Sequence, residues 1–392
     1  MKRSEQRILT THAGSLPRPE RLLEINRAKV AGEDYDQKAY AERLSASVAE
    51  ICRAQAELGV DVVNDGEFGK ATRGAIDYGA WQGYAWGRLS GWEPGEPRPS
   101  PAHSTRRDRA RFADFYRELD GTSFISSSAT VGHPPIVTGP ISYIGRDAVR
   151  ADIENFKAAL STTEAEEGFI TSVAPGSFAR RQNAYYKTDE EFVYALGDAL
   201  REEYTAIVEA GYILQLDDPG LNDSWDMTNP EPDIDEYRAF ATVRIEALNH
   251  ALRGLPEDRI RYHICWGSWV GPHTTDLPLA NIVDLLLNVH AGAYSVETGN
   301  VRHELEWKVW RDVKLPDGKI LIPGVVSHAT NVVEHPELVA DRILRFAGVV
   351  GRENVIAGTD CGLGGRIHEQ LVWAKLQALV EGAALASRAL WA

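Results

Sequence analysis

Two of the three cysteines lie near residues of the kind that bind metal ions. His263 and Cys265 are separated by one residue in a short β-type run, and Cys361 follows a second run at 354–358. Because side chains two apart in a strand point to the same side of the backbone, His263 and Cys265 can reach one ion. Mixed nitrogen and sulfur ligands suit zinc, which commonly takes four ligands in a tetrahedral arrangement.

Glu297 is the fourth candidate ligand. It ends the β-type run 293–296, which lies between the two cysteine motifs along the chain. Any one of these residues alone would more often be an ordinary core residue. All four, however, come at the ends of expected strands, where a barrel enzyme carries its reactive groups. We therefore predict one zinc site, made by His263, Cys265, Glu297 and Cys361.

The strands that would carry these residues recur along the whole chain. Short β-branched runs, each ending in small or polar residues and followed by a helix-like segment, indicate a repeating βα fold. Nine runs qualify, and they end at 11–15, 64–67, 138–140, 173–177, 215–219, 263–265, 295–297, 324–328 and 359–361. Eight strands close a (β/α)8 TIM barrel, so one run must lie outside. We assign 135–141 to an edge hairpin, because its prolines do not suit a central strand.

One stretch, 78–128, interrupts the βα repeat. It contains three tryptophans, a proline-rich patch and a basic run, which are Trp81, Trp86 and Trp92, then 94–101, then Arg106, Arg107, Arg109 and Arg111. Loops of this length in a compact domain are usually functional or disordered. We expect the tryptophans to serve in ordinary packing. The chain is therefore predicted to be one catalytic domain, 1–392, with an insertion at about 78–135 after the second strand.

The composition limits the classes of partner. Apolar residues make up 43% of the chain, which is typical of a globular protein with a sizeable core. The net charge is -15 and no basic stripe offsets it, which disfavours nucleic acid and anionic membranes. No run of 18 apolar residues is present, so we expect a cytoplasmic protein that acts on small molecules, with a homo-oligomer left open. Cys52 lies in a helix-like segment and is expected to be a core residue.

The ordered motifs resemble the catalytic barrel of cobalamin-independent methionine synthase. They are HAGSLP at 12–17, DGE at 65–67, LQLDDP at 214–219, HIC at 263–265, VET at 296–298 and DCGL at 360–363. The resemblance covers most of the chain except 78–128, and the ordered set is far more specific than any one motif. Uroporphyrinogen decarboxylase is similar in fold but lacks the His-x-Cys motif and the later cysteine. The resemblance implies a zinc-dependent methyltransferase that converts homocysteine to methionine.

The same resemblance implies roles for individual residues. The four predicted ligands would hold the zinc, with Glu297 displaced when the substrate thiol binds. Ser15 would hold the carboxylate of an amino-acid thiol, and Glu67 and Asp217 would hold its ammonium. Asp217 and His328 would be the catalytic residues, with His328 as the acid or base that manages protons near the methyl donor.

These roles also follow from elementary chemistry. Zinc lowers the pKa of a bound thiol, so that the sulfur binds as the nucleophilic thiolate at neutral pH. Methyl transfer from a tertiary amine needs a proton on the leaving nitrogen, which is a task for a histidine. Two alternatives stay open. Glu67 and Asp217 could instead cap helices or pair with Arg18 or Arg73, and His328 could be only a hydrogen-bond partner.

The sequence departs from the long form of the family in two respects. It shows no second, N-terminal barrel, and 178–182 lacks the tryptophan associated with folate stacking in the family. The alkyl donor therefore stays open. One alternative function resembles epoxyalkane:coenzyme M transferase, but a sulfonate thiol without an amine would leave the carboxylates of Glu67 and Asp217 unpaired. Another alternative is a non-catalytic barrel with structural zinc, which needs a closed site, whereas an exchangeable Glu297 indicates an open one.

Overall fold

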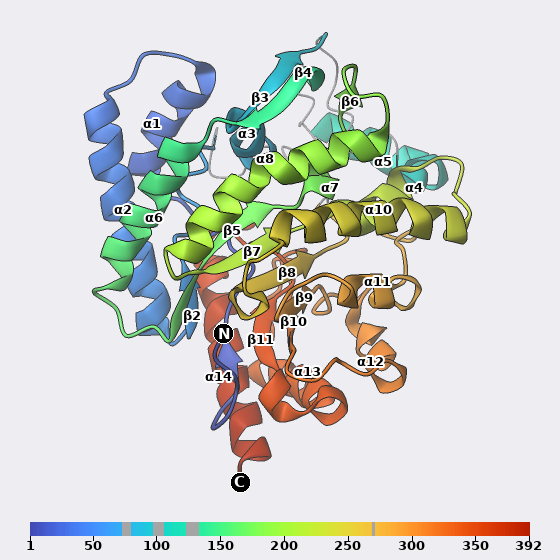
Figure 1. Ribbon diagram of the computed structural model, residues 1–392. Coiled ribbons are helices and arrows are strands. Elements are labelled where there is room, and N and C mark those ends of the chain that lie inside the picture. The colour runs from blue at the N-terminus through green and yellow to red at the C-terminus, as the bar shows by residue number, and fades with distance from the viewer. Residues whose placement is uncertain (73–79, 97–105, 123–132, 269–270) are drawn as a thin grey trace.

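The computed structural model describes residues 1–72, 80–96, 106–122, 133–268 and 271–392 (Figure 1). At its centre lies a parallel sheet of eight strands in the order β1-β11-β10-β9-β8-β7-β5-β2. Their bounds are β1 (Leu9–Thr10), β2 (Val62–Asn64), β5 (Glu167–Val173), β7 (Ile213–Asp217), β8 (Ile260–Ile264), β9 (Ala293–Val296), β10 (Ile320–Val326) and β11 (Ile356–Thr359). A parallel bridge between Thr11 and Val62 joins the two ends of this order. The sheet closes on itself, and the predicted (β/α)8 barrel is confirmed.

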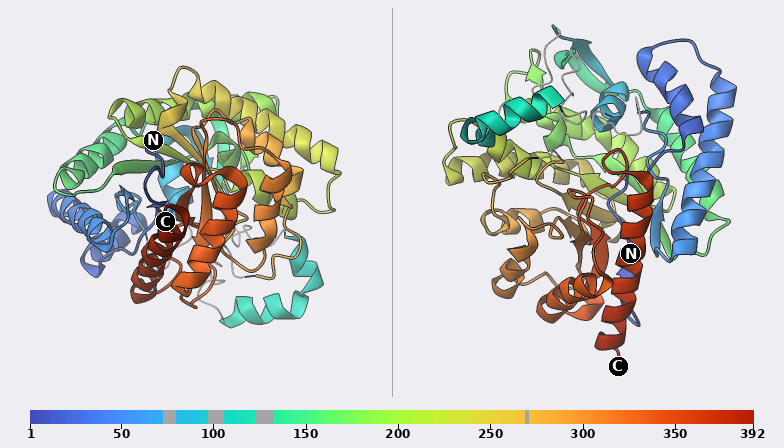
Figure 2. Two further views of the ribbon diagram at one scale, coloured as in Figure 1. Left: turned by 90° about the horizontal axis from the view of Figure 1, so that it is seen from below. Right: turned by 180° about the vertical axis from the view of Figure 1, so that it is seen from behind.

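Helices surround the barrel, as the view from below in Figure 2 shows. They are α1 (Glu20–Ala31), α2 (Gln37–Leu58), α6 (Arg146–Leu160), α7 (Pro175–Phe178), α8 (Asp189–Glu209), α9 (Gly220–Met227), α10 (Ile234–Leu252), α11 (Val283–Leu287), α12 (Val309–Asp312), α13 (Pro336–Val350) and α14 (Glu369–Leu390). Local sequence sets their ends. The Asp36 side chain accepts hydrogen bonds from the first backbone N–H groups of α2, and the Thr188 hydroxyl does the same for α8. Cys52, on α2, is fully buried, as expected for a core residue.

Because side chains alternate along a strand, some polar residues of β7 and β8 point into the barrel. Gln215 on β7 and Arg261 on β8 are both buried, and the Arg261 guanidinium donates to Gln215 Oε1 at 2.6 Å and to Thr11 Oγ1 at 2.9 Å. Two residues further along the same strands come Asp217 and His263, which are Cα partners in the ladder. Because the side-chain period of a strand is two, these residues point to the same side as the pair below them, at the carboxyl ends of the strands.

The segment after β2 forms a separate layer. It contains α3 (Ala80–Gly87), β3 (Leu89–Pro94), α4 (Arg107–Arg111), α5 (Ala113–Thr122) and β4 (Pro135–Tyr143). Strand β4 pairs antiparallel with β3 and parallel with β6 (Gln182–Asn183), so the run at 135–141 lies outside the barrel as predicted. It is the middle strand of this small sheet, however, and the prediction of an edge position is wrong, because β6 pairs with its other side. The remaining parts of the predicted insertion, 78–79, 97–105 and 123–132, lie outside the described residues. The division into one domain with an insertion at 78–135 stays a prediction.

A tryptophan and an arginine of this segment pack against helices of the barrel. Trp86 is buried, and its ring packs edge-on against Phe178 with centroids 4.9 Å apart. Arg106 is also buried and forms ion pairs with two carboxylates of α9, Asp223 and, at 3.0 Å, Asp226. The charge of Arg106 is therefore balanced inside the protein by two carboxylates of α9.

A second buried ion cluster joins the same layer to α8. The carboxylate of Glu203 accepts hydrogen bonds from Arg88 Nη1 at 2.9 Å, from Ser172 Oγ at 2.7 Å and from the hydroxyls of Tyr84 and Tyr143. Burial alone would raise the pKa of Glu203, but Arg88 and these hydroxyl donors hold it below its ordinary value. The ionised form is therefore the one that the fold stabilises.

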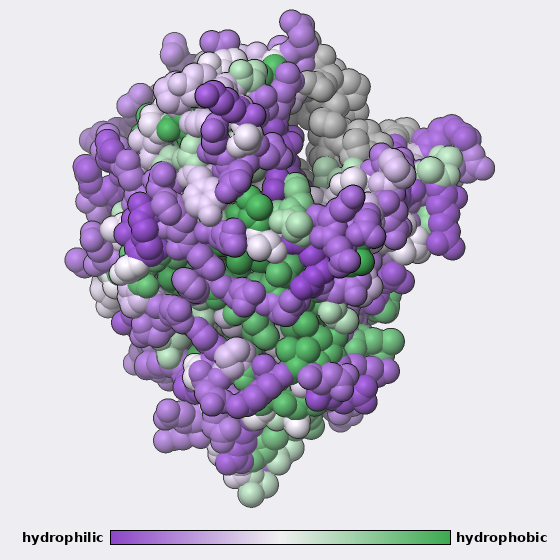
Figure 3. All heavy atoms as spheres, turned by 45° about the vertical axis from the view of Figure 1, so that its right-hand side comes forward, coloured by the Kyte–Doolittle hydropathy of each residue, from purple (hydrophilic) through white to green (hydrophobic). Residues whose placement is uncertain are grey.

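The outer surface is largely polar. The face shown in Figure 3 is mostly hydrophilic, with apolar side chains exposed mainly across its middle. Within the part of the chain that is described, no helix combines the length and apolar character needed to cross a bilayer.

Removing Arg88 should destabilise the fold in a pH-dependent way. In Arg88→Met, Glu203 stays buried without its cation, which costs about 3 to 5 kcal/mol of the free energy of unfolding at pH 7. The stabilisation that Glu203 contributes in the wild type is present above the ordinary glutamate pKa and is lost as pH falls through the lowered folded value. The difference between the two proteins should therefore shrink on acidification, as measured by urea unfolding at several pH values.

The exposed ion pair between Arg146 and Glu202 provides the control. Because water screens such pairs, Arg146→Met should leave the free energy of unfolding nearly unchanged. Equal losses in the two variants would contradict the assignment of Arg88 to a buried cluster.

Candidate metal and thiol site

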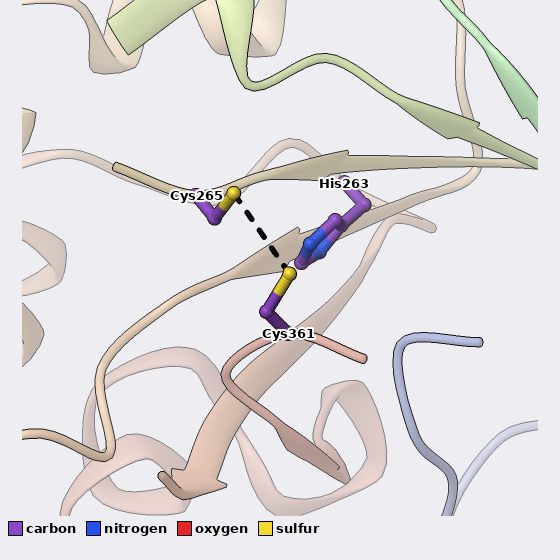
Figure 4. A group of neighbouring side chains, drawn as sticks. All are labelled: His263, Cys265 and Cys361. Carbon is purple, nitrogen blue, oxygen red and sulfur yellow. Dashed lines mark hydrogen bonds between the residues drawn. The ribbon is translucent and has the colours of Figure 1, made fainter. Parts of the chain in front are cut away.

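The structure brings three of the four predicted metal ligands together. His263 lies on β8, Cys265 directly follows that strand, and Cys361 follows β11; all three are buried. Their ligand atoms lie within 4.8 Å of one another, and the two sulfurs are 3.9 Å apart (Figure 4). Two sulfurs at zinc–sulfur bond length in a tetrahedral site are about 3.8 Å apart. The spacing of the sulfurs therefore fits a zinc ion.

The histidine of this group is oriented for a ligand. His263 Nδ1 lies 3.0 Å from Ser295 Oγ on the neighbouring strand β9, which fixes the plane of the ring. The other nitrogen, Nε2, is buried and has no hydrogen-bond partner among the described residues. A metal-binding histidine commonly has one nitrogen held by a neighbouring polar group and the other directed at the ion. His263 has this arrangement.

The two cysteines act electrostatically as a pair. The hydrogen bond between the two sulfurs lowers the pKa of Cys361 well below its ordinary value, and the charge of Arg366 lowers it further. The same contact with Cys361, together with burial, raises the pKa of Cys265. The pair of thiols therefore loses its first proton readily. Loss of the second proton requires a compensating positive charge, which a divalent cation would supply.

Glu297, the fourth predicted ligand, is held beside this group. Its Oε2 accepts from the backbone N–H of Trp266 at 2.9 Å, and its Oε1 accepts from Asn300 Nδ2 at 2.7 Å. Its carboxylate clusters with the side chains of His328 and Asp360. Burial, and then the charge of Asp360, raise the pKa of Glu297 well above its ordinary value. Ligation by Glu297 stays a prediction, and it requires this carboxylate to leave at least one of its two present donors.

Asp360 was not singled out from the sequence. Its Oδ1 accepts from the backbone N–H groups of Thr298 at 2.8 Å and Gly299 at 2.5 Å, and thus ties the end of β9 to the end of β11. A side chain at Gly324 would place its Cβ 2.2 Å from the same oxygen, so the contact depends on a glycine in β10. The signal in the sequence was a carboxylate directly before Cys361 at a strand end.

A second cluster that sequence reasoning missed lies beside Trp266. Asp276 Oδ2 is 2.8 Å from His273 Nδ1 and 3.0 Å from His303 Nε2, and the His303 ring stacks on Trp266 at 3.9 Å. Burial alone would lower the pKa of His303, but the contacts with Asp276, Glu306 and Glu297 raise it to about 9. His303 is therefore an imidazolium that supports the loop between Cys265 and Glu297. Nothing in the sequence connects it to the other two residues.

The carboxylate of Glu67 is positioned by a tight turn after β2. Glu67 has φ of 61°, which is a costly conformation for a residue with a side chain. Arg18 Nη2 holds the turn by donating to the carbonyl oxygens of Glu67 at 2.7 Å and of Lys70 at 3.0 Å. These contacts are with the backbone of the turn, and the alternative in which Arg18 pairs with the Glu67 carboxylate stays a prediction. Arg73, the other partner considered, lies outside the described residues.

Asp217 is buried at the end of β7, and few contacts offset the cost of burying its charge. Its Oδ1 accepts from Gln215 Nε2 at 2.7 Å. Burial raises the pKa of Asp217 to about 7, and the charge of His263 opposes the shift. The charge of Glu67 adds to the rise in the pKa of Asp217, which places the two carboxylates in one electrostatic environment. Such a site favours an incoming cation.

Ser15 is attached to the turn that follows Cys361. Its hydroxyl donates to the carbonyl oxygen of Gly364 at 3.2 Å, and its own carbonyl oxygen accepts from the N–H groups of Leu363 and Gly364. A Cβ added at Gly362 would lie 2.9 Å from the Cβ of Ser15. This close approach puts the predicted carboxylate-binding residue next to a predicted metal ligand.

His328 follows β10 and is buried, and its Nδ1 has no hydrogen-bond partner among the residues described. Burial lowers its pKa to about 3, an effect that Cys361 opposes and Arg366 reinforces. The ring is therefore neutral at physiological pH. A general-acid role requires it first to take up a proton, so its free nitrogen would act initially as a base.

Comparison with known proteins agrees with this fold and shows the family of the chain. Residues 113–385 match the family described as "Cobalamin-independent synthase, Catalytic domain". The methionine synthase of Saccharolobus solfataricus is 26% identical over 383 residues, which cover 95% of this chain and 93% of the relative. The methionine synthase of Sulfolobus acidocaldarius is 25% identical over 363 residues, covering 90% and 85%.

Solved structures agree on the fold. A B12-independent methionine synthase from Shewanella sp. W3-18-1, in complex with selenomethionine, matches with a TM-score of 0.69 and 19% identity, covering 98% of this chain and 99% of that one. A second, described as a putative vitamin-B12 independent methionine synthase from Listeria monocytogenes, matches with a TM-score of 0.64 and 18% identity, covering 96% and 98%. With the family match spanning well over half of the residues, the chain belongs to the cobalamin-independent methionine synthase catalytic domain family.

Proposed function

We propose that the chain is a zinc-dependent methyltransferase that methylates the sulfur of homocysteine to form methionine. The observation that carries the proposal is the buried group of His263, Cys265 and Cys361, with its sulfurs 3.9 Å apart and a histidine nitrogen free for a ligand. Family membership supports the reaction class, and similarity to methionine synthases over 95% of the chain supports the product. We also propose that 1–392 works as one catalytic domain, with 78–135 inserted in it.

His263, Cys265 and Cys361 would hold the metal, and Glu297 would be the exchangeable fourth ligand. When bound, zinc would lower the pKa of the substrate thiol so that the sulfur is a thiolate at neutral pH. The present partners of Glu297, the Trp266 N–H and Asn300, suit the position of this carboxylate when the substrate sulfur has replaced it. The Glu297 carboxylate would then have partners in both predicted states: the metal when it is a ligand, and these two hydrogen bonds when it has been displaced.

The remaining residues would bind substrate and move a proton. Glu67 and Asp217 would hold the ammonium of homocysteine, and Ser15 would hold its carboxylate. The reaction moves the thiol proton to the leaving group of the donor as the sulfur–carbon bond forms. A neutral His328 with a free Nδ1 suits this task, because it can accept the proton released on thiol binding and then donate it. The donor is a folate-type or another methyl compound, and the donor pocket stays unassigned.

Zinc content should depend on Cys361 and not on Cys52. We expect one zinc per chain in metal-replete protein, loss of the metal in Cys361→Ser and retention in Cys52→Ala, measured by atomic emission on the purified proteins. Because the barrel has its own core, chelated protein should keep its circular dichroism spectrum, unlike a zinc finger. Full zinc content in Cys361→Ser would contradict the site, and unfolding on chelation would favour a purely structural zinc.

Glu67→Gln should impair recognition of the substrate amine. Losing a hydrogen bond between two charged groups costs about 1.5 to 3 kcal/mol, or roughly a ten- to hundredfold loss of affinity. The KM for homocysteine should rise by this factor, while that for 4-mercaptobutanoate, which keeps the thiol and carboxylate but has no amine, should change little. Steady-state kinetics with both thiols measures the difference. An equal rise for both would show that Glu67 does not read the ammonium.

His328→Ala should slow methyl transfer from a donor with a nitrogen leaving group by about a hundred- to ten-thousandfold, the usual worth of a positioned proton donor. Zinc content and thiol binding should stay near the wild type. A sulfonium donor, whose leaving group needs no proton, should restore much of the rate. If the variant loses thiol binding and sulfonium turnover together, His328 has a structural role instead.

A further inference from the structure

A buried lysine lies behind the carboxylate of Glu67. Lys70 is only 5% exposed, and its Nζ donates to Thr171 Oγ1 at 2.5 Å and to the Thr171 carbonyl oxygen at 3.2 Å. The same Nζ is 3.4 Å from Glu67 Oε1. The Thr171 hydroxyl in turn donates to Glu67 Oε1 at 2.6 Å. One oxygen of Glu67 is therefore held by an ammonium and a hydroxyl from the protein.

The other oxygen of Glu67 is left for a ligand. Among the described residues, Glu67 accepts side-chain hydrogen bonds through Oε1 and none through Oε2, although Glu67 as a whole is only 7% exposed. Asp217 shows the same division, since Gln215 engages its Oδ1 only. Gly14, with φ of 122°, leaves room for the fixed oxygen, because a Cβ there would lie 2.6 Å from Glu67 Oε1. Both carboxylates thus have one fixed oxygen and one that can accept from a substrate.

The layer inserted after β2 closes the far side of Lys70. The Tyr84 ring, on α3, lies 4.4 Å from Lys70 Nζ, and the Tyr84 hydroxyl donates to Glu203 at 3.0 Å. Lys70 Nζ therefore contacts a threonine, a carboxylate and an aromatic ring. Together these three contacts hold the ammonium in place. Its charge acts from a fixed position behind Glu67.

We propose that Lys70 is the positioning residue for recognition of the substrate amine: with Thr171 it fixes Oε1 of Glu67, so that Oε2 is presented to the ammonium of an amino-acid thiol or thioether. This inference rests on the proposed function. Lys70 places its ammonium 3.4 Å from Oε1 of the buried Glu67 carboxylate and, with Thr171, limits that carboxylate to one orientation. The free oxygen then needs no rearrangement when the ammonium arrives, and a ligand without an amine gains nothing from this arrangement.

The test compares binding of methionine with binding of 4-(methylthio)butanoate, which differs only by the amine. Isothermal titration calorimetry on zinc-loaded protein gives the ratio of the two dissociation constants. We expect the wild type to favour methionine by tenfold or more, and Lys70→Met to reduce this ratio about tenfold, with Lys70→Arg retaining most of it. Thr171→Val, which removes the other contact to Oε1 without changing any charge, should lower the ratio as well and serves if Lys70→Met does not fold.

A double-mutant cycle separates positioning from general support of the barrel. If Lys70 acts through Glu67, then adding Lys70→Met to Glu67→Gln should cause no further loss of the ratio. Lys375→Met is the matched control, because Lys375 is also fully buried and paired, with Glu334 at 2.9 Å. It should lose stability while keeping the preference for methionine.

Two results in Lys70→Met would overturn the inference. A ratio equal to that of the wild type, whether or not both ligands bind more weakly, would exclude a role in amine recognition. A higher ratio would mean that Lys70 repels the ammonium. A wild type that binds both ligands equally would instead remove the homocysteine assignment, and the role of Lys70 with it, so that failure of the proposed function is recognised before any variant is measured.

Discussion

The alternation of side chains on neighbouring parallel strands is the constraint on which the site depends. Residues on β7, β8 and β9 are in register, so that Asp217, His263 and Ser295 lie side by side across the three strands. Two positions earlier on β7 and β8, Gln215 and Arg261 form a buried polar layer beneath them. Shifting one strand by a single residue would turn His263 away from the sulfurs and Arg261 out of the barrel. Closure of the sheet, and the buried hydrogen bonds of Arg261, oppose such a shift.

Burial makes it important which polar groups near the strand ends have a hydrogen-bond or charge partner and which do not. Every charged side chain in the interior needs compensation, and most have it: Asp360 has two backbone N–H donors and Glu203 has an arginine and three hydroxyls. The groups at the rim are less well compensated. His263 and His328 each have a buried nitrogen without a partner among the described residues, and Asp217 has its pKa raised to about 7 by burial. Incomplete compensation of this kind marks a place where a ligand supplies the missing partner.

The sequence predicted the barrel and three neighbouring candidate metal ligands because both depend on local pattern. Strand ends are visible in short β-branched runs, and the spacing of His263 and Cys265 determines their common direction. The contact of Glu297 with the Trp266 N–H could not be predicted in this way, since the two residues follow different strands and meet only in the folded barrel. The same holds for Lys70, whose partner Thr171 is on a distant strand. The neutral state of His328 also escaped prediction, because it results from burial and not from residue type.

The layer after β2 is more than a cover for the barrel. Its Tyr84 contacts both Lys70 and Glu203, and its Arg88 forms an ion pair with Glu203 at 2.9 Å. The buried cluster that fastens this layer therefore shares a residue with the group that positions Glu67. A substitution in the layer can then affect substrate recognition without touching the substrate, because it changes the enclosure of Lys70. An insertion that breaks the βα repeat thus becomes part of the wall behind Glu67, and its sequence is constrained by the buried charges that it encloses.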